Sequence, residues 1–307
     1  MNPTSIRVIV ILLVGLMAAA TASTLVRLAL EEGMPPIVIA AGRLLVATVI
    51  LGPIALTRHR HEFRKLNARD WQLLLLCGIV LGAHFVAWIS SLEYTSVLAS
   101  VTLVSTAPLF VLIFGLIFLR ERVSRIVVIG ITVTIMGSLV VGLGADAGHA
   151  TIRAAPLLGN SLSVLGAVAF ALCFVIGRRL RSKLHVVPYV TVVYGVGALF
   201  LTVITVARGG TFWGYSPAAY LWLVGVGLLP QLIGHSAFNY ALGYFPAAYV
   251  GLMTRFEPIG STLLAAFVLG EWPKPIAIVG GLVILVGVAL PSWSVLVGAG
   301  RARDAAG

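Results

Sequence analysis

Long apolar runs dominate the chain, and short polar segments separate them. Ten runs are long enough to cross a hydrocarbon core of about 30 Å as a helix. They lie at residues 6–28, 36–57, 71–91, 95–119, 124–143, 158–178, 187–207, 217–241, 246–269 and 275–296. Prolines such as Pro36, Pro156 and Pro217 stand where they fit the first helical turn. The pattern predicts an all-α integral membrane protein with ten transmembrane helices.

The second half of the chain repeats the first at an offset of 150 residues. Identical residues on this offset include Tyr94/Tyr244, Pro108/Pro258, Glu121/Glu271, Gly130/Gly280 and Gly137/Gly287. Such a fixed period marks internal repeats, and we place them at 12–143 and 158–291, joined by an external linker at 144–157. Because five helices is an odd number, the second repeat enters the membrane inverted. Inverted repeats place a binding site near the midplane, at the interface between them.

Composition excludes an ordinary soluble protein. Apolar residues make up 60% of the chain and charged residues 10%, and the mean hydropathy is +1.07. A net charge of +11 suggests nucleic acid, but the basic residues fall in short loops between apolar runs, so membrane topology explains them better. We therefore expect no nucleic-acid partner. Cys77 and Cys173 both lie inside apolar runs, which leaves no disulfide framework or cysteine metal site.

The first apolar run has two interpretations. Arg7, the apolar stretch after it and the small residues 18–23 resemble a cleaved signal peptide. We favour a first transmembrane helix, because the apolar stretch is about 20 residues long and can span a bilayer. Its removal would also leave the first repeat one helix short.

Basic residues in the loops predict the orientation. With the N-terminus inside, the cytoplasmic side holds Arg7, Arg58, Arg60, Arg64, Lys65, Arg69, Arg120, Arg122, Arg125, Arg178, Arg179, Arg181, Lys183, Arg301 and Arg303. The outside holds Arg27, Arg153, Arg208 and Lys274. Cytoplasmic loops are enriched in arginine and lysine. We therefore expect a multi-pass protein of the plasma (inner) membrane with both termini cytoplasmic.

Five ionisable residues fall inside the spans: Arg43, His84, His235, Arg255 and Glu257. Lipid penalises such groups, so they are functional candidates. Arg255 and Glu257 are two residues apart and point in different directions on a helix. Glu257 has two interpretations that stay open: an interhelical ion pair, for example with Arg43, or a contact to substrate or a proton. The two arginines also suggest a carboxylate-bearing substrate, which a guanidinium binds through two bonds.

Two polar pairs share the helical spacing of four residues, which puts each pair on one face. They are His84 with Trp88 in the third span, and His235 with Asn239 in the eighth. We expect these faces to oppose each other across a cavity, although interhelical hydrogen bonding is the simpler alternative. Trp88 and Tyr94 could stack on a ring or serve only in packing. Neither histidine has a carboxylate or cysteine beside it, so we expect no metal site.

Other signals concern the scaffold. We expect Glu121 and Glu271 to act structurally, each near the start of a helix. The glycines of the fifth and tenth spans allow close helix approach, and we place those spans at the periphery. The chain has no phosphate-binding loop and no hydrolase or zinc-protease signature. We therefore expect neither a cofactor nor catalytic residues, and no enzyme.

The chain resembles the EamA-type permeases of the drug/metabolite transporter superfamily. The segments that carry the resemblance are Gly234–Leu242, Arg255–Pro258, Leu269–Pro273 and Gly280-Gly281, with Arg43, Leu92–Ser96, Ala107-Pro108 and Leu119–Arg122 in the first half. The resemblance implies a ten-helix basket with inverted repeats and a cavity lined mainly by spans one, three, four, six, eight and nine. It also implies secondary transport, often export of metabolites, amino acids or drug-like compounds. His235, Asn239 and Glu257 fall on positions that look like the family's pattern.

We therefore predict a secondary transporter that moves a small metabolite or drug-like compound outward by alternating access. The candidate substrate contacts are Arg43, His84, Trp88, Tyr94, His235, Asn239, Arg255 and Glu257. The expected partners are the substrate and the lipid bilayer, while proton coupling through Glu257 and the histidines is a hypothesis and a homodimer stays open. The rival interpretations are a downhill facilitator, a membrane sensor and a lipid-acting enzyme. The enzyme fits least, because the candidate groups are spread over several spans.

Overall fold

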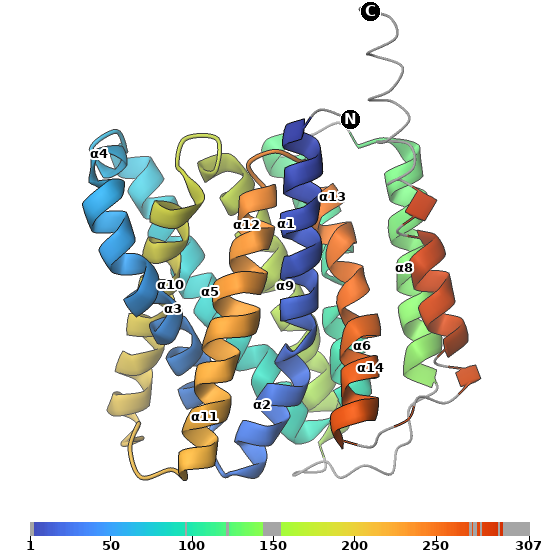
Figure 1. The fold of residues 1–307 in the computed structure, drawn as a ribbon. Coiled ribbons are helices and arrows are strands. Elements are labelled where there is room, and N and C mark those ends of the chain that lie inside the picture. The colour runs from blue at the N-terminus through green and yellow to red at the C-terminus, as the bar shows by residue number, and fades with distance from the viewer. Residues whose placement is uncertain are drawn as a thin grey trace, which may run out of the picture.

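The computed structural model describes residues 3–95, 97–120, 123–143, 155–269, 272, 275–276, 278–287 and 289–290. Helices fill these ranges and pack side by side into one bundle (Figure 1), with no strand in the described ranges. Within these ranges, six helical stretches are long and apolar enough to cross a membrane: Ile6–Glu31, Pro36–Arg58, Ala68–Tyr94, Pro156–Leu180, Val186–Ala207 and Pro217–Ala241. An all-α, multi-pass membrane architecture is therefore confirmed, and the full count of ten spans stays a prediction.

The described residues of the first half form eight helices and one π-helical segment. They are α1 (Pro3–Ala20), α2 (Ala22–Glu31), α3 (Pro36–Arg58), α4 (Arg60–Phe63), α5 (Ala68–Tyr94), α6 (Val97–Val104), α7 (Ala107–Phe114), η1 (Gly115–Leu119) and α8 (Arg125–Leu143). The first predicted span is thus α1 followed by α2, and they meet at Thr21. Its hydroxyl donates to the carbonyl of Ala18 at 2.7 Å, a local bond typical of threonine at a helix irregularity.

The second half has the same plan. It contains α9 (Pro156–Leu180), α10 (Val186–Ala207), α11 (Pro217–Val226), η2 (Gly227–His235), α12 (Ser236–Ala241), α13 (Ala247–Met253), η3 (Thr254–Phe256) and α14 (Glu257–Leu269). Residues 278–287 form a last helix. The π-helical η2 contains Pro230, which has no backbone N–H to donate.

The predicted fourth and ninth spans are each interrupted at the same place in their repeat. In the fourth span α6 ends at Val104 and α7 begins at Ala107, and in the ninth the 3-10 turn η3 separates α13 from α14. A proline follows each interruption in the sequence, at 108 and 258. The missing proline N–H removes one helical hydrogen bond, which favours a break just before it. Ser105 and Arg255 therefore sit at equivalent breaks.

The main helix contacts are symmetric between the two halves: when a helix of one half packs on a helix of the other, the equivalent pair is also packed. Helix α1 packs against η2 and α12, and the exchanged pair, α5 with α9, is also packed together. Helix α3 packs on its counterpart α10, and α7 packs on α13. Every one of these contacts joins one half of the chain to the other. The halves therefore do not form separate domains but share one interface through the middle of the bundle.

The fifth and tenth spans pack through glycine. A Cβ on Gly137 would lie 2.8 Å from the backbone N of Ile284, and one on Gly287 would lie 2.8 Å from the backbone N of Thr134. Only glycine allows such a backbone approach without displacement. Helix α8 and the helix of residues 278–287 lie together at one edge of the bundle (Figure 1), in agreement with the peripheral position predicted for the fifth and tenth spans.

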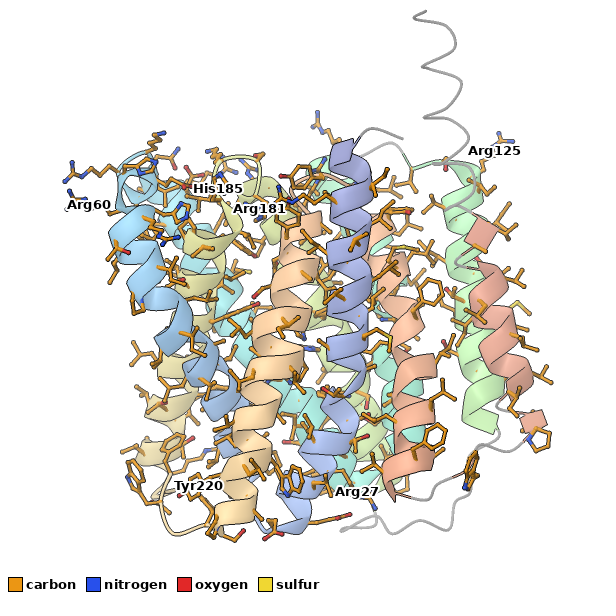
Figure 2. The ribbon with its side chains drawn as sticks, in the orientation of Figure 1. Arg27, Arg60, Arg125, Arg181, His185 and Tyr220 are labelled. Atoms are coloured by element: carbon orange, nitrogen blue, oxygen red, sulfur yellow. The ribbon has the colours of Figure 1, made fainter. Side chains whose placement is uncertain are left out.

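The two ends of the bundle differ in charge. Arg60, Arg125 and Arg181 lie at one end, which we call the basic end, and Arg27 and Tyr220 lie at the opposite end (Figure 2). The charge pattern of the sequence placed the first three of these residues together on the cytoplasmic side. The predicted linker at 144–157 falls almost wholly outside the described residues, as do Glu121, Glu271 and the chain beyond residue 290.

Polar bonds join the two halves at the basic end. The Glu62 carboxylate accepts a hydrogen bond from the backbone N–H of His185 and another from Nδ1 of His59, both at 2.7 Å. Burial raises the pKa of Glu62, but these bonds and the neighbouring imidazoles lower it by more, so the net pKa lies below its usual value. Lys183 contacts both carboxylate oxygens of Asp70, at 2.8 and 2.9 Å.

Candidate substrate site

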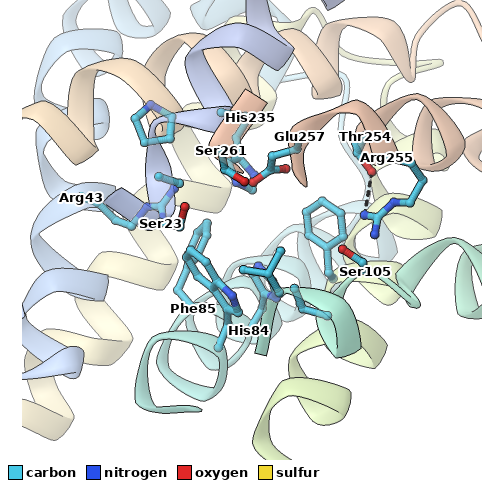
Figure 3. A pocket seen from close by; sticks show the side chains of 17 residues that line it. Ser23, Arg43, His84, Phe85, Ser105, His235, Thr254, Arg255, Glu257 and Ser261 are labelled. Atoms are coloured by element: carbon cyan, nitrogen blue, oxygen red, sulfur yellow. Dashed lines mark hydrogen bonds between the residues drawn. The ribbon is translucent and has the colours of Figure 1, made fainter. Parts of the chain in front are cut away.

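A cavity lies between the two halves of the bundle (Figure 3). Its walls come from α1, α2, α3, α5 and α6 of the first half and from α9, η2, η3 and α14 of the second. All six spans that the family resemblance named contribute, and the second span adds Arg43. The cavity volume is about 60 Å³.

Arg43 reaches this cavity from α3. It is fully buried, at 0% exposure, and its Nε donates a hydrogen bond of 2.9 Å to the side-chain oxygen of Gln231. Its Cζ lies 3.9 Å from the centre of the Phe85 ring, a cation–π geometry. Within the described part of the chain, Nη1 and Nη2 have no hydrogen-bond partner. Arg43 is therefore fixed on one side, and both of its terminal nitrogens lack a protein acceptor.

Arg255 enters the cavity from η3 and is held in a similar way. Its Nη2 donates to the hydroxyl oxygen of Thr254 at 3.0 Å, and that hydroxyl in turn donates to the carbonyl of Gly251 at 2.7 Å. Arg255 is 5% exposed, and its Nε and Nη1 have no hydrogen-bond partner among the described residues. The interruption of the ninth span thus turns a charged side chain toward the cavity.

Glu257 begins α14 and lies on the same cavity wall. A carboxylate is favoured at a helix N-terminus, where backbone N–H groups point outward. No ion pair within 4.0 Å joins it to Arg43 or Arg255 in the described ranges. The ion pair with Arg43 is therefore not formed here, and the partner of Arg43 is the neutral Gln231.

The two histidines meet at the cavity, as their helix faces suggested. Nδ1 of His84 donates to the carbonyl of Gly166 at 2.8 Å, which leaves Nε2 as an acceptor in the neutral ring. The His84 ring packs on Phe85 and Phe170, with centroids 4.8 and 4.9 Å away. His235 packs on the same two rings at 5.1 and 5.8 Å. One aromatic cluster therefore positions both imidazoles.

The remaining three predicted contacts divide. Trp88 lines the cavity, and its buried Nε1 has no partner among the described residues. Tyr94 and Asn239 are not part of the cavity wall. Asn239 is engaged elsewhere: its side-chain nitrogen donates to the carbonyl of His235 at 2.8 Å, and its own carbonyl accepts from Nε of Arg181 at 2.9 Å. Six of the eight predicted residues thus come together.

Unpartnered polar atoms give the cavity its chemical character. Among the described residues that line it, the buried polar atoms without a partner are Nη1 and Nη2 of Arg43, Nε and Nη1 of Arg255, and Nε1 of Trp88. All five are N–H donors. Buried donors without acceptors are costly, so the site favours a ligand that is rich in acceptor oxygens.

Sequence reasoning missed the residues that hold the arginines. Gln231 and Thr254 are both buried, at 0% and 1% exposure. Gln231 stands four residues before His235, so the helical spacing could have placed it on the same face. It also lies in η2, and π-helical segments are frequent at functional sites. Neither residue is ionisable, which is why a search for charges in the spans passed over them.

Comparison with known proteins agrees with this architecture. The profile of the EamA-like transporter family matches residues 6–143 and 157–293. A probable terminal-alkyne amino-acid exporter of Streptantibioticus cattleyicolor is 29% identical over 86% of this chain and 85% of its own length. The uncharacterized transporter YxxF of Bacillus subtilis is 25% identical over 81% of this chain and 78% of its own.

The fold itself has a counterpart among solved structures. One crystal structure matches 92% of this chain and 96% of its own chain with a TM-score of 0.74, at 20% sequence identity. That likeness shows a shared fold and nothing of the substrate. The family profile covers both halves of the chain, on either side of the segment between them. The chain therefore belongs to the EamA-like transporter family.

Proposed function

We propose that the protein is a secondary transporter that exports a small carboxylate-bearing metabolite, such as an amino acid, by alternating access. The observation that carries this proposal is the pair of buried guanidinium groups on the cavity wall, each with two nitrogens that have no partner in the described ranges. Ionisable groups within membrane spans mark substrate pathways. A guanidinium binds a carboxylate through two parallel charge-assisted bonds.

Size and similarity support the same class of compound. A volume of about 60 Å³ favours a small metabolite over a drug-sized ligand. One relative is named a probable exporter of an amino acid, which carries a carboxylate. The proposed direction, outward, follows that relative. Glu257 on the same wall would face the ammonium group of such a compound.

Ten spans in two inverted repeats, with both termini cytoplasmic, would place this cavity near the membrane midplane. The basic end would then face the cytoplasm. Hydrogen bonds between the halves occur at both ends: Glu62 with His185 at the basic end, and Thr95 with Asn160, at 2.9 Å, at the other. Alternating access requires one set to break while the other holds.

Glu257 supports proton coupling. It is the only carboxylate among the described residues that line the cavity, and no ion pair within 4.0 Å occupies it there. If the Glu257 carboxylate binds either a proton or the ammonium group of the substrate, the proton and the substrate compete for it. That competition is the simplest basis for exchange of protons against substrate.

Flux measurements test the proposed function. Purified protein is reconstituted into liposomes loaded with a mixture of amino acids and organic acids, and each compound released is quantified by mass spectrometry. We expect release of a small carboxylate compound, with little release by Arg43→Gln and normal release by Arg27→Gln, whose partner Glu31 is exposed. If no compound is released faster than from loaded liposomes without protein, the proposal is contradicted.

A further inference from the structure

We propose that the transported compound carries two acidic groups, one bound by Arg43 and the other by Arg255. This inference rests on the proposed function and deepens it. A single carboxylate has two oxygens, whereas the two guanidinium groups have four nitrogens without a hydrogen-bond partner in the described ranges. Three features of the cavity support two acidic groups: the neutral partner of each arginine, the positions of the charged residues and the number of N–H donors without an acceptor.

Each arginine is fixed by a neutral acceptor. The side-chain oxygen of Gln231 accepts a hydrogen bond from Nε of Arg43, and the hydroxyl oxygen of Thr254 accepts one from Nη2 of Arg255. A neutral partner orients a guanidinium without cancelling its charge. In membrane proteins buried charges normally find a charged partner, and no residue in the described ranges forms an ion pair with either arginine. Glu257 is the one carboxylate on the described cavity wall, and no ion pair within 4.0 Å joins it to either arginine, so both guanidinium groups can still bind an anion from the substrate.

The two guanidinium groups approach the cavity from opposite sides (Figure 3). Arg43 lies on one side with Phe85 against it, Arg255 lies on the other near Ser105, and Glu257 lies between them. With neutral histidines, these three charged residues sum to one positive charge. An ammonium group beside Glu257 and an acidic group at each arginine would pair all three. The fitting class is a small amino acid with a second acidic group.

Hydrogen-bond capacity leads to the same class. Arg43 and Arg255 each present two unpartnered nitrogens, and a carboxylate has two oxygens to accept them. Trp88 adds a fifth donor. One carboxylate has only two oxygens, half the number of unpartnered guanidinium nitrogens in the described ranges. Two acidic groups supply at least four acceptor oxygens, which matches the donors on the two walls.

Gln231 and Thr254 are then positioning residues. Each acts through its arginine and does not touch the substrate in this account. Replacing Thr254 by valine keeps the volume and removes the oxygen that holds Nη2 of Arg255. The variant should lower the affinity for a compound with two acidic groups by a larger factor than the affinity for a compound with one. A purely structural role would lower both together.

The test compares ligands that differ by one charge. Dissociation constants are measured by calorimetry on the purified protein for L-glutamate against L-glutamine, and for O-phospho-L-serine against L-serine. We expect the compound with two acidic groups to bind at least tenfold more tightly than its partner in at least one of the two pairs. Preference for glutamate identifies the second group as a carboxylate, and preference for phosphoserine alone identifies it as a phosphate; either supports the proposal.

Variants assign the two groups to the two arginines. Arg255→Gln should reduce the preference for glutamate over glutamine to less than threefold, and Thr254→Val should reduce it in the same direction if the first variant does not fold. Arg27→Gln serves as a control and should keep the preference. Equal binding within both pairs by the wild type, glutamate with glutamine and phosphoserine with serine, would overturn the inference and leave the proposed function standing. Absence of binding for all four compounds would also overturn the inference, whereas the proposed function falls only if no compound of the flux mixture is released.

Discussion

Replacing Glu257 by glutamine keeps the size of the side chain and removes the carboxylate from the cavity wall. Among the described cavity residues Glu257 carries the only carboxylate, so the structure predicts one exchangeable proton for each substrate molecule. One proton crossing a difference of one pH unit releases about 1.4 kcal/mol, which corresponds to a concentration ratio of about tenfold. In exchange transport the substrate accumulates on the acidic side.

The assay uses liposomes with the membrane potential clamped at zero by potassium and valinomycin. The equilibrium ratio of labelled substrate across the membrane is measured at several pH differences. The wild type should give about a tenfold ratio for each pH unit. Glu257→Gln should give a ratio of one at every pH difference, while it still exchanges labelled for unlabelled substrate.

Two results would refute this reasoning. A wild-type ratio of one under an imposed pH difference would remove proton coupling altogether. A tenfold ratio that survives Glu257→Gln would move the coupling to another group, with His84 and His235 the next to replace. Glu31→Gln is the control, because Glu31 pairs with Arg27 away from the cavity and should leave the ratio unchanged.

Three further predictions concern the scaffold and the site. Glu62→Gln should lower the free energy of unfolding by about 1–3 kcal/mol at pH 7, because it removes a charged acceptor. The pKa of Glu62 is lowered in the folded protein, so its contribution to stability is present above the ordinary glutamate pKa and is lost as the pH falls through the folded pKa. The melting curves of wild type and variant should therefore converge in acid. Gly137→Ala should cost about 1–3 kcal/mol by crowding Ile284, whereas Gly52→Ala, with nothing within 4 Å, should cost nothing, and equal melting temperatures for both variants would contradict the close packing. Gln231→Leu should weaken substrate binding about tenfold by freeing Arg43, and an unchanged dissociation constant would show that Gln231 does not orient it.

Sequence reasoning located much of the site because lipid makes charge conspicuous. Arg43, His84, His235, Arg255 and Glu257 stand out in apolar spans by their cost alone, and all five line the cavity. The long helices were predictable for a related reason, since apolar runs of bilayer length are rare by chance. The matched helix contacts are those expected of a unit that occurs twice, at an offset of 150 residues.

The partners of these charges were not predictable from the sequence. One of the two interpretations of Glu257, an ion pair with Arg43, followed from the cost of a lone charge, and the structure pairs Arg43 with the neutral Gln231 instead. The breaks at Ser105 and at η3 are also invisible to hydropathy, because hydropathy measures the length of an apolar run and not the continuity of its backbone. Only the repeated prolines at 108 and 258 signalled them.

The central claim, that the cavity between the halves is the substrate site, is tested most directly by protection from alkylation. Ser23 lines the cavity and Thr57 is exposed near the basic end, so each is replaced by cysteine in a background with Cys77 and Cys173 changed to alanine. The rate of maleimide labelling is then measured with and without the transported compound. We predict that the compound slows labelling at position 23 at least tenfold and leaves position 57 unaffected. Equal labelling of position 23 with and without a compound that the same protein transports would contradict the account.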